Sequence, residues 1–245
     1  MMSVVGLGKP TTSNERRLTK SENTMTKKNE VALTDAQMSL PSFAVAPEGT
    51  KTAADTVASD DLAVPQLKLL QPGSPEVTSI AGATPGAFFN TVSQETVSEV
   101  MCVNISSTTT YGIFNKAART LVAIFDTLSE ADTALAALPG SPSMYDLSES
   151  KVHSCYALKE DGTLDYPFRL YFKSTGIRIA QNWNTDIINR YGQQAPRHAG
   201  VYKLTREMRK NDKGTWYLPK PEFQGYVQSA EVFAQLNEIA TSFDK

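Results

Sequence analysis

The sequence predicts a mainly β fold with added helices, of the α+β class. From about residue 60 onward, short segments rich in β-branched and aromatic residues alternate in polarity between turn signals. Two later segments carry apolar residues at the three- and four-residue spacing of helices. Ahead of them, residues 1–58 are rich in Ser, Thr, Lys and Glu and hold one aromatic residue, Phe43.

We divide the chain into a flexible N-terminal arm, residues 1–58, and one domain, residues 59–245. An arm of that composition buries too little apolar surface to offset the entropy that ordering would cost. The remaining residues are enough for one hydrophobic core. No apolar run reaches the roughly 20 residues of a membrane-spanning helix. The N-terminus also lacks the apolar core of a signal peptide.

The first half of the domain is predicted to consist of strands. Pro65 cannot donate to a sheet, so the segment that contains it is expected to be a lead-in or edge strand. Residues 108–114 either continue the segment before them or pair with it. Residues 121–125 are uniformly apolar, which predicts a buried strand. The strand segments of this half are residues 62–71, 87–92, 98–107 and 121–125.

A helix is expected over residues 129–138, because Ser129 can cap it and acidic residues follow. Alternation then predicts strands over residues 152–158 and 166–173. In the second of these, one face holds Tyr166, Phe168, Leu170 and Phe172, and the other holds Arg169, Tyr171 and Lys173.

Two further helices follow. One begins near Ser174 and ends at Gly192, and its spacing predicts that Trp183 lies in the core. The other is an amphipathic C-terminal helix over residues 229–243, which is expected to pack on the domain or on a second subunit.

Catalytic and metal-binding motifs are missing. The sequence contains no phosphate-binding glycine loop, no HExxH and no GxSxG. His153 and His198 are far apart and lack a metal-ligand pattern. Cys102 and Cys155 do not form a CxxC pair and are expected to be buried free thiols, with a disulfide as the alternative. We therefore expect no enzymatic activity, no cofactor and no metal.

Residues 166–226 differ from the rest in charge. They include eleven aromatic residues and eleven Lys or Arg but four Asp or Glu, a local charge of +7 in a chain of net charge −2. Cations neutralise phosphates while flat rings stack on unpaired bases. The strongest candidate element is a hairpin of residues 200–209 and 215–227, closed by Asn-Asp-Lys-Gly at 211–214 and interrupted by two prolines.

This pattern predicts a platform for single-stranded nucleic acid. The alternative is that the rings fill the core and the cations form a solvated face. The expected stacking rings are Tyr171, Tyr202, Trp216 and Tyr217. The expected phosphate contacts are Arg169, Lys173, Arg178, Lys203, Arg206, Arg209, Lys210 and Lys213.

A resemblance to a family of small bacteriophage proteins extends over about residues 60–228. It is carried by DDLAVPQLKLLQPGSPEV, GAFFNT, YFKSTGIRIAQNW, VYKLTREMRKNDKGTWYLP and FQGYV. That family is similar to the phage single-stranded DNA-binding proteins of replication and recombination. Such proteins often recruit partners through an acidic tail, whereas this chain ends in TSFDK.

The resemblance implies an OB-like β-barrel with an inserted helix and a C-terminal helix. It implies binding of single-stranded DNA without sequence specificity, in the cytoplasm of an infected host cell and away from membranes. The partners it implies are phage replication or recombination proteins and a second copy of the chain. Two other classes of function are open: a virion or assembly protein, and an inhibitor of a host protein that acts through an edge strand.

Overall fold

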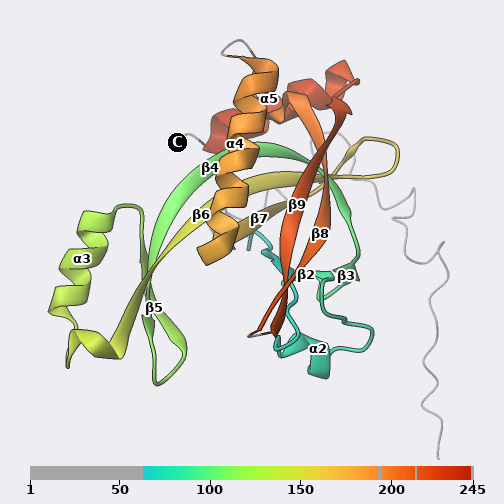
Figure 1. Ribbon diagram of the computed structural model, residues 1–245. Helices are drawn as coiled ribbons and strands as arrows, with labels where there is room; N and C mark the ends of the chain where they lie inside the picture. Colours follow the sequence, from blue (N-terminus) through green and yellow to red (C-terminus); the bar gives the residue numbers. More distant parts are fainter. Residues whose placement is uncertain (1–62, 193–194, 213, 244–245) are drawn as a thin grey trace, which may run out of the picture. The chain divides into compact units, whose positions relative to one another are not determined.

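The computed structural model describes residues 63–192, 195–212 and 214–243. All of them belong to the second of the chain's two units, Val57–Lys245. The predicted N-terminal arm and Lys213 lie outside the described residues. The fold is mainly β with helices, as the sequence predicts (Figure 1).

Two antiparallel sheets form the framework. The larger has six strands in the order β7-β6-β4-β8-β9, with β5 paired to β4 beside this path, and the smaller has the order β1-β2-β3. The larger sheet consists of β4 (Val100–Asn115), β5 (Thr120–Phe125), β6 (Tyr145–Leu158), β7 (Leu164–Lys173), β8 (Gly200–Asn211) and β9 (Gly214–Tyr226). The smaller consists of β1 (Leu67–Leu69), β2 (Phe88–Asn90) and β3 (Thr96–Val97).

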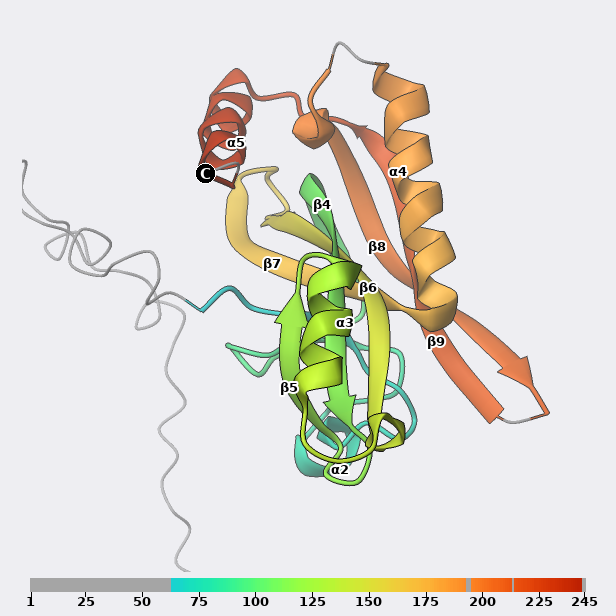
Figure 2. The same ribbon diagram turned by 90° about the vertical axis from the view of Figure 1, so that its left-hand side faces the viewer.

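The helices lie at different places on the larger sheet. Helix α3 (Leu128–Ala137) contacts β4, β5 and β6. Helix α4 (Ile177–Tyr191) contacts β6, β7 and β9. The C-terminal helix α5 (Ala230–Phe243) contacts β4 (Figures 1 and 2). The short elements are α2 (Glu76–Ser79) and the 3₁₀ turns η4 (Pro142–Met144), η5 (Ser174–Gly176) and η6 (Arg197–Ala199).

The larger sheet is open, whereas the resemblance implied an OB-like barrel. Within the described residues its end strands, β7 and β9, do not pair with each other. One edge of β4 pairs with β6, while the other edge is divided between β8 at residues 100–103 and β5 at residues 111–115. The described strands therefore form an open path from β7 to β9, with β5 attached to β4 beside it.

The main core lies between α4 and the sheet. Phe168, Leu170 and Phe172 project into it from β7 and are at most 1% exposed, which confirms the predicted alternation. Trp183 of α4 is 2% exposed. Its ring is stacked on that of His153 with 4.7 Å between the centroids, so its predicted place in the core is confirmed.

The prediction for residues 121–138 needs two corrections. The strand at residues 121–125 forms, but Leu121 and Ile124 are 47% and 49% exposed. An aliphatic run is buried only if other layers cover it, and here β5 has few neighbours besides β4 and α3. The cap of α3 is Thr127 instead of Ser129, and its hydroxyl oxygen accepts a hydrogen bond from the Glu130 backbone N–H at 3.3 Å.

The C-terminal elements form as predicted, with one difference. β9 runs without a register shift through Pro219 and Pro221, because an edge strand tolerates the loss of outward N–H donors. Gly214 has the positive φ expected of the hairpin, 139°. The amphipathic helix α5 packs Val232 and Leu236 in a second cluster on the domain. Cys102 and Cys155 are free and buried, as expected.

A close approach at Gly200 yields a test of the core. A Cβ atom at this position would overlap the hydroxyl of Tyr191, which itself donates to the Tyr202 hydroxyl at 3.1 Å. We expect Gly200→Ala to lower the free energy of unfolding by about 1–3 kcal/mol through overpacking.

Urea denaturation measures this change. Gly73→Ala is the matched control, because no atom lies within 4 Å of a Cβ there, and it should be neutral or slightly stabilising. Adding Tyr191→Phe should restore part of the loss at Gly200. Equal midpoints for Gly200→Ala and Gly73→Ala would contradict the packing described.

Candidate functional site

A groove runs along β7. Two pockets, of about 170 Å³ and 220 Å³, share Gln66, Tyr171 and Lys173. The first continues to β9 and the second to the ends of β4 and β5. We call the two together the β7 groove. Its side chains with chemistry of interest are Gln66, Lys68, Phe114, Tyr171, Lys173 and Tyr217.

The alternation of β7 places the centre of the groove. Because Phe168, Leu170 and Phe172 face the core, Arg169, Tyr171 and Lys173 project from the opposite face. Residues directly opposite on neighbouring strands share a face. On this face Val152 of β6 lies opposite Tyr171, and the other neighbours from β6 and β4 carry hydroxyl groups, namely Ser150, Ser154, Ser106, Thr108 and Thr110. The result is a polar sheet face with one aromatic ring between two cations.

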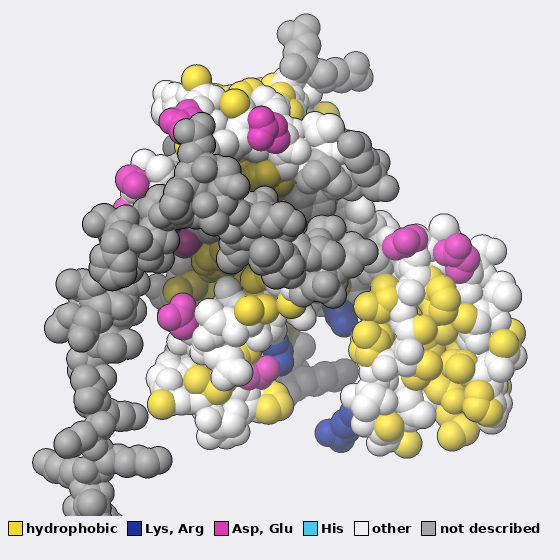
Figure 3. All heavy atoms as spheres, turned by 180° about the vertical axis from the view of Figure 1, so that it is seen from behind, with side chains coloured by type: hydrophobic (Ala, Val, Ile, Leu, Met, Phe, Trp, Pro, Cys, Tyr) yellow, Lys and Arg dark blue, Asp and Glu magenta, His cyan; other side chains and the backbone are white. Residues whose placement is uncertain are grey.

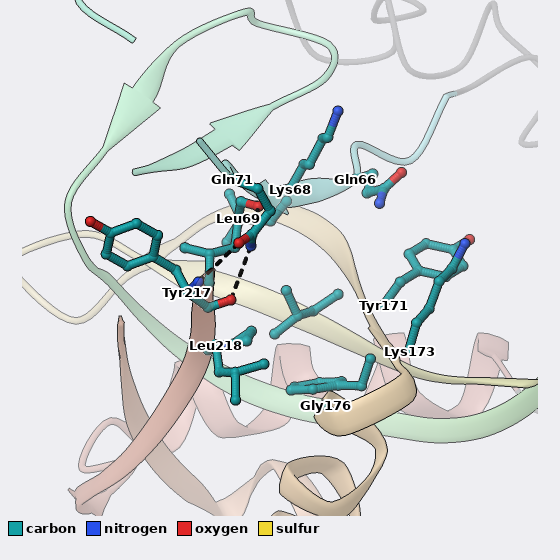
Figure 4. Close-up of a pocket in the computed structure, with 13 residues that line it drawn as sticks. Gln66, Lys68, Leu69, Gln71, Tyr171, Lys173, Gly176, Tyr217 and Leu218 are labelled. Atoms are coloured by element: carbon teal, nitrogen blue, oxygen red, sulfur yellow. Dashed lines mark hydrogen bonds between the residues drawn. The ribbon is translucent and has the colours of Figure 1, made fainter. Parts of the chain in front are cut away.

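Gln71 fixes one end of the groove. Its side-chain oxygen accepts from the Tyr217 backbone N–H at 2.9 Å, and its side-chain nitrogen donates to the Tyr217 carbonyl at 3.0 Å (Figure 4). Beside it, Arg206 donates to the Gly86 carbonyl at 3.2 Å. A Cβ at Gly86 would lie 2.9 Å from the Tyr217 ring. Strand β9 is therefore clamped to the segment around β1, and Tyr217 is held at the rim.

The cations of the groove differ in their partners. Lys68 donates to Glu76 at 2.8 Å, and this hydrogen bond lowers the pKa of Glu76. Lys173 instead lies over the Phe114 ring, 4.6 Å from its centroid, and partial burial lowers its pKa. Arg169 lies beside the groove on the same strand but lines neither pocket; it is exposed and forms no ion pair with any residue that the structure describes. Lys173 and Arg169 thus keep charge available to an anion.

Tyr202 lies in the core and not at the groove. It is 1% exposed, its ring meets that of Trp183 edge-on at 5.4 Å, and its hydroxyl donates to Asp186 at 3.2 Å. Burial raises the pKa of this hydroxyl far above its usual value. Its ring is not available for stacking on a ligand in this structure.

The other predicted residues are dispersed over the hairpin and α4. Trp216 pairs with Arg209 and Tyr217 pairs with Met208, so the two predicted rings face opposite sides of the hairpin. Lys203 is bound to Glu99 at 2.7 Å and Arg209 to Glu207 at 2.9 Å. Arg178 and Lys210 are exposed but do not line the groove. Lys213 lies outside the described residues.

The sequence reasoning missed the contributions of β1 and β4. Gln66 and Lys68 line the groove, and their alternation with Leu67 and Leu69 could have identified them as one face of a strand. Phe114 lines it too, but nothing local indicates that the end of β4 reaches Lys173.

A buried polar cluster beneath α4 resembles a catalytic arrangement. The Ser107 hydroxyl lies 3.3 Å from His153 Nε2, and the Asn104 side-chain nitrogen lies 2.7 Å from His153 Nδ1. Arg197 donates to the Asn104 side-chain oxygen at 2.9 Å and to the Asn184 side-chain oxygen at 2.6 Å.

The direction of these hydrogen bonds opposes catalysis. Because Arg197 occupies the Asn104 oxygen, Asn104 must donate to His153 through its nitrogen. His153 then carries its proton on Nε2 and donates to Ser107, so it cannot accept the proton of that hydroxyl. The cluster satisfies buried polar groups between α4 and the sheet, which is a structural role.

This cluster predicts a pH dependence of stability. Burial and the nearby Arg197 charge lower the pKa of His153 from 6.5 to about 3. Between those pH values the unfolded chain binds a proton that the folded chain does not, so stability falls as pH falls. The contribution is up to about 1.4 kcal/mol per pH unit.

Denaturation between pH 7 and pH 5 checks this, because most carboxylates remain ionised there. His153→Gln lacks the titration and should show a flatter dependence than the unaltered protein. The His153 ring signals in an NMR titration should stay those of the neutral form down to about pH 4. A midpoint near 6.5 would overturn the buried placement.

Searches for a metal site and a membrane span, and comparisons with known proteins, complete the description of the chain. Within the described ranges, no group of three His, Cys, Asp or Glu is placed to hold a metal. None of the described helices is long and apolar enough to cross a membrane. A family model described as Pam3 phage gp34-like protein matches residues 19–245. No curated protein and no solved structure matches.

Proposed function

Since the chain belongs to the Pam3 phage gp34-like protein family, a family of bacteriophage proteins, we propose that it binds single-stranded DNA without sequence preference along the β7 groove. One observation carries the proposal: Tyr171 projects from the sheet face between Arg169 and Lys173. The role we assign is to protect or organise single strands during phage DNA replication or recombination.

The spacing on β7 suits a flexible polyanion. Residues two apart on a strand lie about 6.6 Å apart on the same face, so a cation stands on each side of the tyrosine ring. A base can stack on the ring while neighbouring phosphates approach Arg169 and Lys173. Each stacked base contributes about 1–3 kcal/mol, whichever base it is, because all bases have a flat face.

The ends of the groove extend the platform. Phe114 provides a second ring at the β5 end, while Tyr217 lines the β9 end with its ring packed near Gly86 and the main core. The hydroxyl groups of the sheet face can bind phosphate or sugar without reading sequence. The expected specificity is therefore for single strands, whose bases are free to stack, over duplex.

A second candidate, an assembly protein of the phage particle, is favoured by the exposed aliphatic surface of β5. It does not require the cations of the groove. The oligonucleotide titration described next decides between the two, because the assembly reading expects no salt-dependent binding.

We expect Tyr171→Ala to weaken binding of a labelled oligo-dT of about 30 nucleotides by roughly 5- to 150-fold, the equivalent of one lost stacking contact. Fluorescence anisotropy at low salt, with unlabelled duplex as competitor, measures it. Tyr171→Phe keeps the ring and should bind almost normally.

Tyr226→Ala is the matched control, because Tyr226 is a partly exposed tyrosine outside the groove. Equal affinities for the Tyr171→Ala and Tyr226→Ala proteins would remove Tyr171 from the site. If the unaltered protein fails to bind even at low salt, the proposed function is wrong.

Lys173→Met tests the phosphate contact. Losing one contact to a single strand should reduce the slope of log affinity against log salt by about 0.7, with the same fold confirmed by circular dichroism. Lys159→Met, in the exposed β6–β7 turn, should leave the slope unchanged. An unchanged slope for Lys173→Met would mean that this ammonium group does not touch the nucleic acid.

A further inference from the structure

The outer edge of β5 is a strand edge without a described partner and with exposed aliphatic side chains. β5 pairs with β4 through one edge, and no other described strand pairs with it. Its aliphatic side chains Leu121, Val122 and Ile124 are 47%, 43% and 49% exposed. Leu128, which follows β5 at the start of α3, is 47% exposed as well. Figure 3 shows apolar side chains gathered over the part of the molecule that contains these elements.

Such an edge would recruit other strands if it were left open. Proteins usually guard an edge strand with lysine, proline or an inward-pointing charge. Thr120–Phe125 reads TLVAIF and contains none of these side chains; its protection is limited to its short length and one β-bulge. A short uncharged segment of this composition is also prone to stack into fibrils. A specific partner strand that covers the edge removes both hazards.

We propose that β5 pairs antiparallel with β5 of a second copy, about a two-fold axis between Val122 and Ala123. In this register Leu121 faces Ile124 of the second copy, and Thr120 faces its Phe125. The two larger sheets then continue into one another. A two-fold contact of this kind is self-complementary and closes at two chains.

The β-bulge of the hairpin makes this register possible. When a strand pairs with a second copy of itself about a two-fold axis, two residues that lie opposite each other must project from the same face of the sheet. Within one copy, those two residues must therefore also share a face. In a regular strand Leu121 and Ile124, three apart, would lie on opposite faces. Here the register shift aligns Leu121 with Phe114 and Ile124 with Gly112. Phe114 and Gly112 are two apart on β4, so Leu121 and Ile124 share a face.

The charges at the ends of β5 fit the same register. Arg119 precedes the strand and Asp126 follows it. Neither forms an ion pair with another described residue. In the proposed pairing, Arg119 of each copy lies opposite Asp126 of the other. The proposed register therefore brings together two Arg119–Asp126 pairs and two Leu121–Ile124 pairs across the axis. Because the strand complements itself in charge and in apolar contacts, we favour a second copy over an unrelated strand as the partner.

Sedimentation equilibrium over a concentration series tests the pairing. The unaltered protein should form dimers. Ile124→Lys, which places a charge in the paired edge, should be monomeric. Arg119→Asp and Asp126→Arg should each weaken the dimer roughly tenfold or more, because both end pairs become like-charged. Arg119 has φ 52°, a conformation that aspartate tolerates.

Charge exchange makes the test specific. Mixing the Arg119→Asp protein with the Asp126→Arg protein should restore dimers, as should the double variant Arg119→Asp/Asp126→Arg alone. Lys159→Asp, an equal charge change away from β5, should leave the dimer unaffected. A monomeric unaltered protein at about 100 µM, or dimers that no β5 variant weakens, would overturn the inference. It does not rest on nucleic-acid binding, so a dimer that binds no oligonucleotide would end the proposed function alone.

Discussion

The division of one edge of β4 is the constraint on which the other features depend. β4 is 16 residues long and gives one edge to β6 over nearly its whole length. The other edge starts with β8 and ends with β5. β8 continues into the hairpin with β9, and β5 continues into α3. The hairpin and α3 therefore leave β4 at opposite ends of that strand. The β7 groove lies beyond the opposite edge of β4, along the strand that pairs with β6.

Much of the fold could be predicted from local pattern, and its closure could not. Alternation identified both faces of β7, and helical spacing placed Trp183 in the core, because each depends on the periodicity of one element. The open sheet depends on whether β7 meets β9, strands that are far apart in the sequence. The exposure of Leu121 and Ile124 was missed for a similar reason, since an aliphatic strand looks the same whether or not another layer covers it.

The candidate site shows the same limit. The sequence singled out Tyr171 and Lys173 through a two-residue repeat, and Tyr217 through the hairpin. It could not show that Tyr202 faces α4, or that Trp216 and Tyr217 lie on opposite sides of β9, because register across the hairpin decides which face a residue takes. Gln71 was missed because its role as a clamp depends on a contact 146 residues away.

The prolines of β9 determine how many neighbours this molecule can accept. Pro219 and Pro221 remove two donors from the strand at one end of the larger sheet. At the other end, the Arg169 backbone N–H of β7 already donates to the Pro65 carbonyl at 2.8 Å. The outer edge of β5 has neither a proline nor a described backbone partner, and its β-bulge is the one interruption of its ladder. Prolines at one end of the larger sheet and a neighbouring segment at the other leave β5 as the end where a further strand would meet neither.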